Sequence, residues 1–273
     1  MQIKTYTEVK NFLDENLTLL EKEEVINNKI IGTLLKLLDY KLKDNELLLS
    51  IKHNDLMLWA MKIRNNELML TGNKLCIDTF LEFIKLNKIE ISSIFGKNSL
   101  IEYFKDNYYK NSDISMRTIL YSLENLLEIK ISNGYIRKVK ESDKETVISF
   151  LDGFLYDCFN EKDPIFSEKT FDKMLKEGTL YVWKDREISS IAGIVRKTKN
   201  TSTISYVYTP KLFRKKGYGT SIVYEISKAI LNDGFKYSTL FADKNNPNSN
   251  VIYKKIGYKK VQDFSLIKIT NEH

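Results

Sequence analysis

A strand-like segment that runs into a basic, glycine-containing turn and then into a helix constrains this chain more than any other feature. Residues Thr203 to Tyr208 are rich in β-branched and aromatic types, which favours a strand. After the turn, apolar residues at helical spacing predict a helix that ends at Gly234; they are Ile222, Val223, Ile226, Ala229 and Ile230. A further strand is predicted at 237–241. We therefore expect a βαβ unit with two parallel strands.

The turn itself has the chemistry of an anion-binding site. Gly217 and Gly219 let the backbone pass close to a bulky group. The first amides of the following helix point out of its N-terminus, where the helix dipole is positive. Such an arrangement is suited to a pyrophosphate, and Arg214, Lys215 and Lys216 add positive charge around it. The glycine spacing differs from the dinucleotide-binding fingerprint, and no acidic ribose ligand can be placed on a following strand.

A second informative segment runs from Asn246 to Tyr258. Asn246 is a good helix cap, and Pro247 suits the first helical position. Tyr253 follows the cap by seven residues, two helical turns on, so it lies on the same face. Its phenol is expected to lean toward the end of the strand at 237–241. Gly257 and Tyr258 then return the chain to the sheet.

The remaining pattern predicts α/β (α+β) structure in both halves. In the second half we expect the order β-α-β-β-β-α-β-α-β-β, which gives a mixed, mostly antiparallel sheet with a βαβ unit at its centre. Its first helix follows a possible capping box, Ser142 and Glu145. The first half opens with a helix after a similar box, Thr5 and Glu8, alternates helices with strands, and carries no chemical motif.

Glycines and prolines divide the chain unevenly. Only three of the 11 glycines precede residue 130, whereas all three prolines follow it. Asn133-Gly134 is typical of a turn between periodic segments, and 273 residues are enough for two domains. We predict domains at 1–132 and 133–273.

Composition argues against several classes of protein. The N-terminus lacks the apolar region of a signal peptide, and no stretch reaches the ~20 apolar residues of a membrane span. Cys76 and Cys158 lie in different halves without metal-ligand spacing, so we expect no metal, no membrane and a cytoplasmic location. The net charge of +7 comes with no nucleic-acid-binding module, so nucleic acid is not an expected partner.

The two segments together resemble the GNAT superfamily of N-acetyltransferases. Arg214-x-x-Gly217-x-Gly219 matches the pyrophosphate-binding Arg/Gln-x-x-Gly-x-Gly/Ala motif of that family. Asn246-x-x-Ser249-x-x-Ile252-Tyr253-x-x-x-Gly257-Tyr258 is similar to the family's Asn-x-x-Ala-x-x-Leu-Tyr-x-x-x-Gly-Phe segment. The joint match covers about residues 135–270, and it implies a splayed sheet flanked by helices.

A looser resemblance extends to the first half. Val207-Tyr-Thr-Pro210 resembles a bacterial branch of the family, and Asn27-Asn28-Lys-Ile-Ile-Gly32 resembles a signature near the start of those proteins. Phe95-Gly96 followed by Met116-Arg-Thr-Ile-Leu-Tyr-Ser-Leu123 resembles a later pattern. This implies that 1–132 is a degenerate GNAT-like α/β domain without its own acetyl-CoA motif.

The resemblance also implies a site. The pantetheine arm of acetyl-CoA would pair with the backbone of Val207, Tyr208 and Thr209, where an amide stabilises the oxyanion. The pyrophosphate would lie on the turn, formed by Arg214, Lys215, Lys216, Gly217, Tyr218, Gly219 and Thr220. Asn246 would contact the cofactor arm. Tyr253 is the candidate general acid for the departing thiolate; the alternative is a tyrosine packed on the sheet.

The acceptor side is less defined. The strand at 203–208 contains no acid, and Asp152 and Asp157 on the first helix of this half are better read as solvated surface, so no general base is assigned. The acceptor is expected to be a small-molecule or peptide amine, and the protein a monomer or homodimer. Two alternatives stay open: a non-catalytic acetyl-CoA-binding or partner-binding module, and an acetyltransferase associated with nucleic acid.

Overall fold

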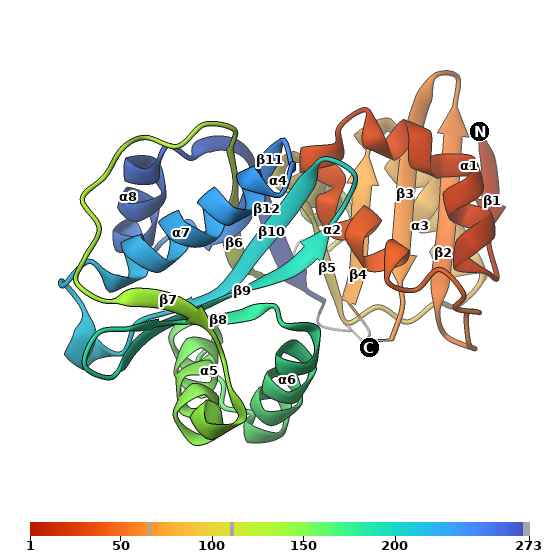
Figure 1. Ribbon diagram of the computed structural model, residues 1–273. Coiled ribbons are helices and arrows are strands. Elements are labelled where there is room, and N and C mark those ends of the chain that lie inside the picture. The colour runs from red at the N-terminus through yellow and green to blue at the C-terminus, as the bar shows by residue number, and fades with distance from the viewer. Residues whose placement is uncertain (65–66, 110–111, 270–273) are drawn as a thin grey trace. The chain divides into compact units, whose positions relative to one another are not determined.

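The computed structural model describes residues 1–64, 67–109 and 112–269. The chain forms two compact units, one made of Met1–Leu120 with the C-terminal segment from Gln262, and one made of Tyr121–Val261. Each unit is a mixed sheet with helices on its faces (Figure 1). The α/β class predicted for both halves is therefore confirmed. Among the described residues, no helix is long and apolar enough to cross a membrane.

The first unit contains, in chain order, β1 (Gln2–Thr5), α1 (Val9–Glu21), α2 (Glu24–Leu35), β2 (Leu47–His53), β3 (Leu56–Lys62), β4 (Glu67–Gly72), the short 3-10 helix η1 (Lys74–Cys76), α3 (Ile77–Leu86), β5 (Ser93–Lys97), α4 (Asn98–Tyr108) and most of β6 (Ile114–Leu123). Neighbouring strands from β1 to β4 pair antiparallel, and β4 and β5 pair parallel. Phe264–Lys268 of β12 (Lys259–Lys268) pairs antiparallel with β5.

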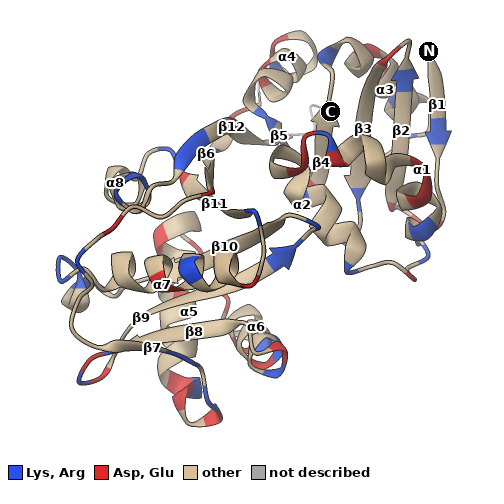
Figure 2. Ribbon diagram, turned by 45° about the horizontal axis from the view of Figure 1, so that its top comes forward, with Lys and Arg blue, Asp and Glu red and all other residues tan. Residues whose placement is uncertain are grey.

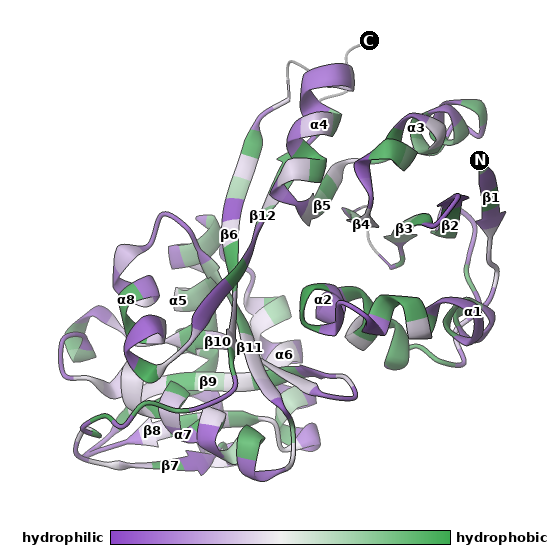
Figure 3. Cartoon of the chain, turned by 90° about the horizontal axis from the view of Figure 1, so that it is seen from above, coloured by the Kyte–Doolittle hydropathy of each residue, from purple (hydrophilic) through white to green (hydrophobic). Residues whose placement is uncertain are grey.

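Strand alternation places a core on each face of this sheet. In β2, Leu47, Leu49 and Ile51 pack in one apolar cluster with residues of α3 and α4. The hydrophobic sides of α2 and α3 face the strands between them (Figure 3). On the α2 side, buried Asn27 donates from Nδ2 to the Leu20 carbonyl (2.9 Å) and accepts from Thr71 Oγ1 (2.7 Å). The Asn27-Asn28 signature thus ties the turn between α1 and α2 to β4.

The second unit contains β7 (Tyr135–Lys138), η2 (Glu141–Asp143), α5 (Lys144–Phe159), α6 (Pro164–Glu177), β8 (Leu180–Lys184), β9 (Ile188–Lys197), β10 (Thr201–Tyr208), η3 (Lys211–Phe213), α7 (Tyr218–Asn232), β11 (Tyr237–Asp243) and α8 (Pro247–Ile256). The strands β7, β8, β9 and β10 pair antiparallel in that order, and β10 pairs parallel with β11. The predicted βαβ unit is β10-α7-β11. One apolar cluster joins α5 and α6 to this sheet, and α7 lies on the opposite face (Figure 1).

The two halves repeat one order of elements. β1-α1-α2-β2-β3-β4-α3-β5-α4-β6 is followed by β7-α5-α6-β8-β9-β10-α7-β11-α8-β12. In each repeat the pair of parallel strands is the fourth and fifth, and one helix connects them.

Several expected boundaries were wrong. The sequence pattern gave no helix at Pro164–Glu177, where α6 lies. Neither predicted capping box forms. Thr5, of the first box, is the last residue of β1. At the second, the Lys140 amide donates to Asp143 (2.7 Å) rather than to Ser142 or Glu145. The two closing strands expected after α8 are the single strand β12.

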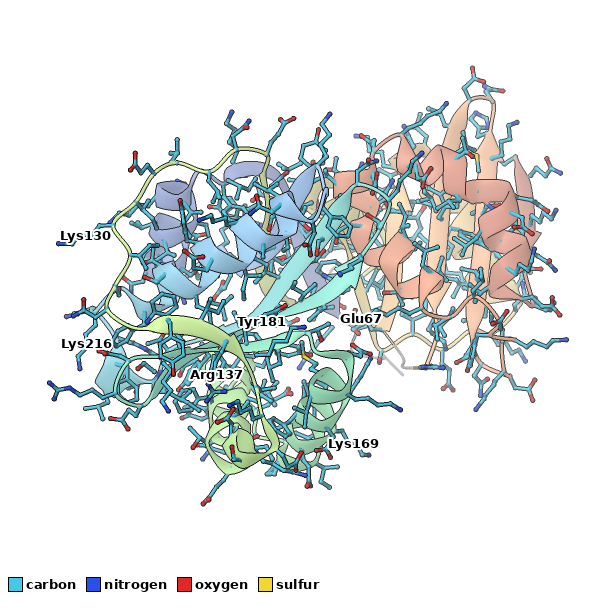
Figure 4. All side chains as sticks on the ribbon, in the orientation of Figure 1. Glu67, Lys130, Arg137, Lys169, Tyr181 and Lys216 are labelled. Carbon is cyan, nitrogen blue, oxygen red and sulfur yellow. The ribbon has the colours of Figure 1, made fainter. Side chains whose placement is uncertain are left out.

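A partly buried ion pair fixes the passage from β7 into α5. Arg137 donates to both carboxylate oxygens of Asp143, at 2.6 and 2.9 Å. The two side chains are only 19% and 8% exposed. Arg137, labelled in Figure 4, lies on β7 next to the start of α5. Its guanidinium, with the Lys140 amide, holds the pKa of Asp143 below the usual value, in opposition to burial.

We expect Asp143→Asn to lower the free energy of unfolding by about 2 kcal/mol at pH 7. Because the Asp143 pKa is depressed in the folded state, its contribution is full above about pH 4 and is lost as the pH falls through the folded pKa. Urea unfolding at pH 7 and pH 3 checks this, with Asp172→Asn as the exposed control (52% exposed). A difference between wild type and Asp143→Asn that persists undiminished at pH 3 would contradict it.

Candidate functional site

The end of β10 departs from regular strand geometry. Its parallel register with β11 runs from Thr201–Tyr237 to Ile204–Leu240, and β10 then continues to Tyr208. Between Ser205 and Tyr208 the register with β9 shifts, as at a β-bulge, and Tyr206 adopts a φ of 54°. A bulge re-aims the strand that carries it. The segment Val207–Thr209, expected to meet the pantetheine arm, begins directly after this irregularity.

The loop after β10 leads into a helix whose first backbone amides have no side-chain cap. Lys215 (φ 65°) and Gly217 (φ 84°) both adopt left-handed conformations, and α7 begins at Tyr218 with no side chain capping it. The first amides of α7 therefore lack both intrahelical and side-chain acceptors. Arg214, Lys215 and Lys216 are exposed. Figure 2 shows this loop as a basic stretch, and Figure 4 labels Lys216 within it.

Both glycines of the motif sit where a side chain would collide. A Cβ at Gly217 would lie 2.5 Å from Ser132 Oγ, and one at Gly219 would lie 3.0 Å from Thr209 Oγ1. Ser132 is held in place because its Oγ donates to the Lys216 carbonyl (2.8 Å). An added Cβ would therefore crowd Ser132 at Gly217 and Thr209 at Gly219.

The Arg214 side chain is fixed to the fold. Its Nε donates to the Thr209 carbonyl (2.9 Å), and a terminal nitrogen donates to Asp157 Oδ2 (2.5 Å). The guanidinium also lies 5.8 Å from the ring centre of Tyr208. Asp157 is therefore an ion-pair partner that ties α5 to the loop. The other carboxylate considered as a base, Asp152, accepts from Ser167 Oγ (2.6 Å).

Tyr218 contributes to this loop through its backbone. Its side chain is buried, and the phenol donates to Asp185 Oδ2 (2.8 Å), which raises the phenol pKa. Thr220 is half-buried in the first turn of α7. Side-chain contact with a ligand is therefore expected from the lysines rather than from Tyr218.

Asn246 caps α8 as expected. Its Oδ1 accepts from the Ser249 amide (3.2 Å), and Pro247 occupies the first turn. The residue that binds α8 to the sheet is one that sequence reasoning missed. Asn250, buried, donates to the carbonyls of Asp243 (3.0 Å) and Asn246 (2.7 Å) and accepts from the Tyr121 hydroxyl (3.1 Å). The only local indication of this role in the sequence is that Asn250 follows the cap residue Asn246 by one helical turn.

Sequence reasoning also missed two residues that contact the end of β10: Ser190 of β9 and Gly153 of α5. Ser190 Oγ donates to the Tyr208 carbonyl (2.8 Å) and lies 2.9 Å from Thr209 Oγ1. Gly153 leaves space for Tyr208, since a Cβ there would lie 2.4 Å from the phenol oxygen. A glycine in the middle of an apolar helix indicates that another group packs closely there, so Gly153 could have been identified from the sequence. Nothing in the sequence around Ser190 indicates its contact with Tyr208.

Tyr253 is buried, with 6% of its surface exposed, and its ring lies 5.9 Å from that of Tyr121 and 6.0 Å from that of Tyr258. The Tyr258 hydroxyl is 2.7 Å from both Ser227 Oγ and Ser238 Oγ. The Tyr253 hydroxyl has no hydrogen-bond partner among residues 1–64, 67–109 and 112–269. Burial raises its pKa above the ordinary value, so the phenol keeps its proton at neutral pH. Tyr253 is therefore an available proton donor.

Cys158 of α5 lies close enough to Tyr253 for the two groups to interact electrostatically. Burial, followed by the charges of Asp157 and Asp243, raises the pKa of the Cys158 thiol to about 11. The thiol is therefore protonated at neutral pH.

Comparison with known proteins agrees with this geometry. The FR47-like protein family matches residues 182–266, a range that holds the loop and α8. Among curated proteins, none matches the chain.

Solved structures share the fold over nearly the whole chain. An acetyltransferase of the GNAT family from Colwellia psychrerythraea superposes with a TM-score of 0.61 at 11% identity, covering 99% of this chain and 100% of that one. A GCN5-related N-acetyltransferase from Sphaerobacter thermophilus gives 0.64 at 10% identity, covering 97% and 94%. One from Kribbella flavida gives 0.56 at 12%, covering 82% and 90%. The chain thus has the fold of GNAT acetyltransferases, and residues 182–266 match the FR47-like family, as the resemblance of the two motifs predicts.

Proposed function

We propose that this protein transfers the acetyl group of acetyl-CoA to an amine, and that residues 133–273 are the catalytic domain. The observation that carries the proposal is the loop before α7. This loop follows the bulged end of β10 and leads into α7, which has no side-chain cap. Two of its residues adopt the left-handed conformation, and a Cβ added at either glycine of the motif would lie close to a neighbouring side chain.

The residues present fit the cofactor. The amides of residues 214–220 would hold the pyrophosphate, with Lys215 and Lys216 exposed at the surface to neutralise its charge. The backbone of Val207, Tyr208 and Thr209 would pair with the pantetheine arm, and Asn246 is exposed at the start of α8 to contact it. Acetyl-CoA supplies an activated acetyl group when bound.

Tyr253 would hold the proton that the sulfur receives when the thioester breaks. The phenol is protonated at neutral pH, and its hydroxyl is not committed to another described residue. Asp152 and Asp157 are engaged in internal hydrogen bonds, so we assign no base and infer that the amine loses its proton to solvent.

The first half is proposed to be a degenerate GNAT-like domain of a bacterial, cytoplasmic enzyme. It repeats the element order of the second half, including the parallel β4 and β5 joined by α3. After β4, however, the chain passes through Gly72-Asn73 into η1, without an Arg-x-x-Gly-x-Gly sequence. A role in cofactor binding is therefore assigned to the second half alone.

Incubation with acetyl-CoA and a pooled panel of small-molecule and peptide amines tests the proposal. Mass spectrometry is expected to find products heavier by one acetyl group, together with free CoA. Acetyl-CoA binding without any acetylated product would favour the alternative, a non-catalytic module. Steeply salt-dependent binding to tRNA would instead point to an acceptor associated with nucleic acid.

A further inference from the structure

One partly buried arginine of the second unit, Arg196, has no counter-ion among the described residues. Arg196 lies on β9 opposite Thr203 of β10, next to a register irregularity. Its Nε is sealed from solvent and has no hydrogen-bond partner in the described part of the chain. By contrast, Arg137 and Arg214 each bind a carboxylate. Arg196 as a whole residue is only partly buried.

The surroundings of Arg196 connect it with the proposed transfer point. The guanidinium interacts electrostatically with the phenol of Tyr206, the residue in the left-handed bulge of β10. That phenol is hydrogen-bonded to Thr170 of α6 and its ring packs against Phe154 of α5, 5.5 Å between ring centres. Tyr206 directly precedes Val207–Thr209, the strand end proposed to receive the thioester.

A second orphan polar atom lies directly before β8, at Thr179. Thr179 Oγ1 is buried without a partner among the described residues. The Thr179 carbonyl accepts from the amide of Ile194 (2.8 Å), two residues before Arg196. An arginine Nε that is sealed from solvent without a partner is rare, and a ligand bound to this side chain would complete its hydrogen bonds.

The energetics favour an anion. Burial lowers the pKa of Arg196 to about 10, which still leaves it positively charged at neutral pH. A buried cation without a partner destabilises a fold, so a bound anion would gain both binding and stability. The guanidinium fork matches a carboxylate with two parallel hydrogen bonds.

We propose that Arg196 binds a carboxylate of the acceptor, and that the acceptors are therefore amines that also carry a carboxylate. This rests on the proposed acetyl transfer. Arg196 pairs with Thr203, and Val207 follows four residues later along β10, beyond the bulge at Tyr206. Amine and carboxylate are thus several bonds apart, as in a short peptide.

The test uses one tripeptide with a free C-terminal carboxylate and the same tripeptide as its C-terminal amide. Melting temperature is measured with each, for wild type, Arg196→Met and the exposed control Arg186→Met. We expect the carboxylate form to raise the melting temperature of wild type and Arg186→Met but not of Arg196→Met. With acetyl-CoA, kcat/KM for the carboxylate tripeptide should exceed that for the amide tripeptide at least tenfold in wild type. In Arg196→Met the two values should be about equal.

The outcomes separate this inference from the proposed function. If wild type responds alike to both tripeptides, or if Arg196→Met keeps the preference, Arg196 does not bind a carboxylate. If the carboxylate form stabilises wild type through Arg196 but no peptide is acetylated, the site stands and the proposed function falls. Circular dichroism confirms that Arg196→Met is folded, and removal of an unpaired cation should not destabilise it.

Discussion

Tyr253→Phe is expected to lower turnover by about 100-fold, the lower end of what a positioned general acid contributes. Acetyl-CoA affinity should change by less than about twofold, because the phenol acts only as the thioester breaks. Stability should not fall, because the hydroxyl has no partner among the described residues. Steady-state kinetics and calorimetric titration with acetyl-CoA measure the two effects separately.

Tyr258→Phe is the matched control. Tyr258 is buried beside Tyr253, but its hydroxyl is bonded to Ser227 and Ser238. We expect this variant to lose about 1 kcal/mol of stability and to keep its turnover. Equal turnover in wild type and Tyr253→Phe would remove the acid role and leave Tyr253 as a packing residue.

Gly217→Ala is expected to weaken acetyl-CoA binding at least about tenfold, which is about 1.4 kcal/mol. The added Cβ would lie 2.5 Å from Ser132 Oγ at a residue with a φ of 84°. Relief of this clash displaces Ser132 Oγ, which donates to the Lys216 carbonyl, or moves the loop whose amides are proposed to hold the pyrophosphate. Calorimetric titration with acetyl-CoA measures the loss.

Gly234→Ala separates backbone strain from the loss of the site. Gly234 has a φ of 90° and follows the C-terminal end of α7, and a Cβ added there would meet no atom of the described residues within 4 Å. Both variants should lose about 1 kcal/mol of stability from the left-handed conformation, but only Gly217→Ala should lose affinity. A Gly217→Ala protein that binds acetyl-CoA as tightly as Gly234→Ala would show that the loop is not the cofactor site.

The parts of the site that are continuous in sequence could be predicted. The strand, turn and helix from Thr203 to Gly234 and the cap at Asn246 rest on local rules of propensity and capping, and the structure has them where expected. Helix α6 was missed because two of its four buried residues, Ser167 and Thr170, are hydroxyl-bearing and shorten the apolar stripe. The signals at its ends, Asp163-Pro164 and Gly178, were nevertheless present.

Contacts between distant segments could not be predicted. Arg214 and Asp157 are separated by 57 residues, and nothing local distinguishes Asp157 from a solvated carboxylate. The orphan Arg196 likewise depends on which side chains α5 and α6 bring over the sheet. The bulge at Tyr206 depends on the pairing of β10 with β9 rather than on the residue itself.

The most direct test of the acetyl-CoA site is the melting temperature of the wild-type chain as acetyl-CoA is added. Binding should raise it in a saturable way, and ligand at about 100 times its Kd should add about 2.7 kcal/mol to the free energy of unfolding. Adenosine, which lacks the pyrophosphate and the pantetheine arm, should produce no comparable rise. A melting temperature that stays constant with acetyl-CoA would contradict the assignment of residues 207–220 and 246–258 as the cofactor site.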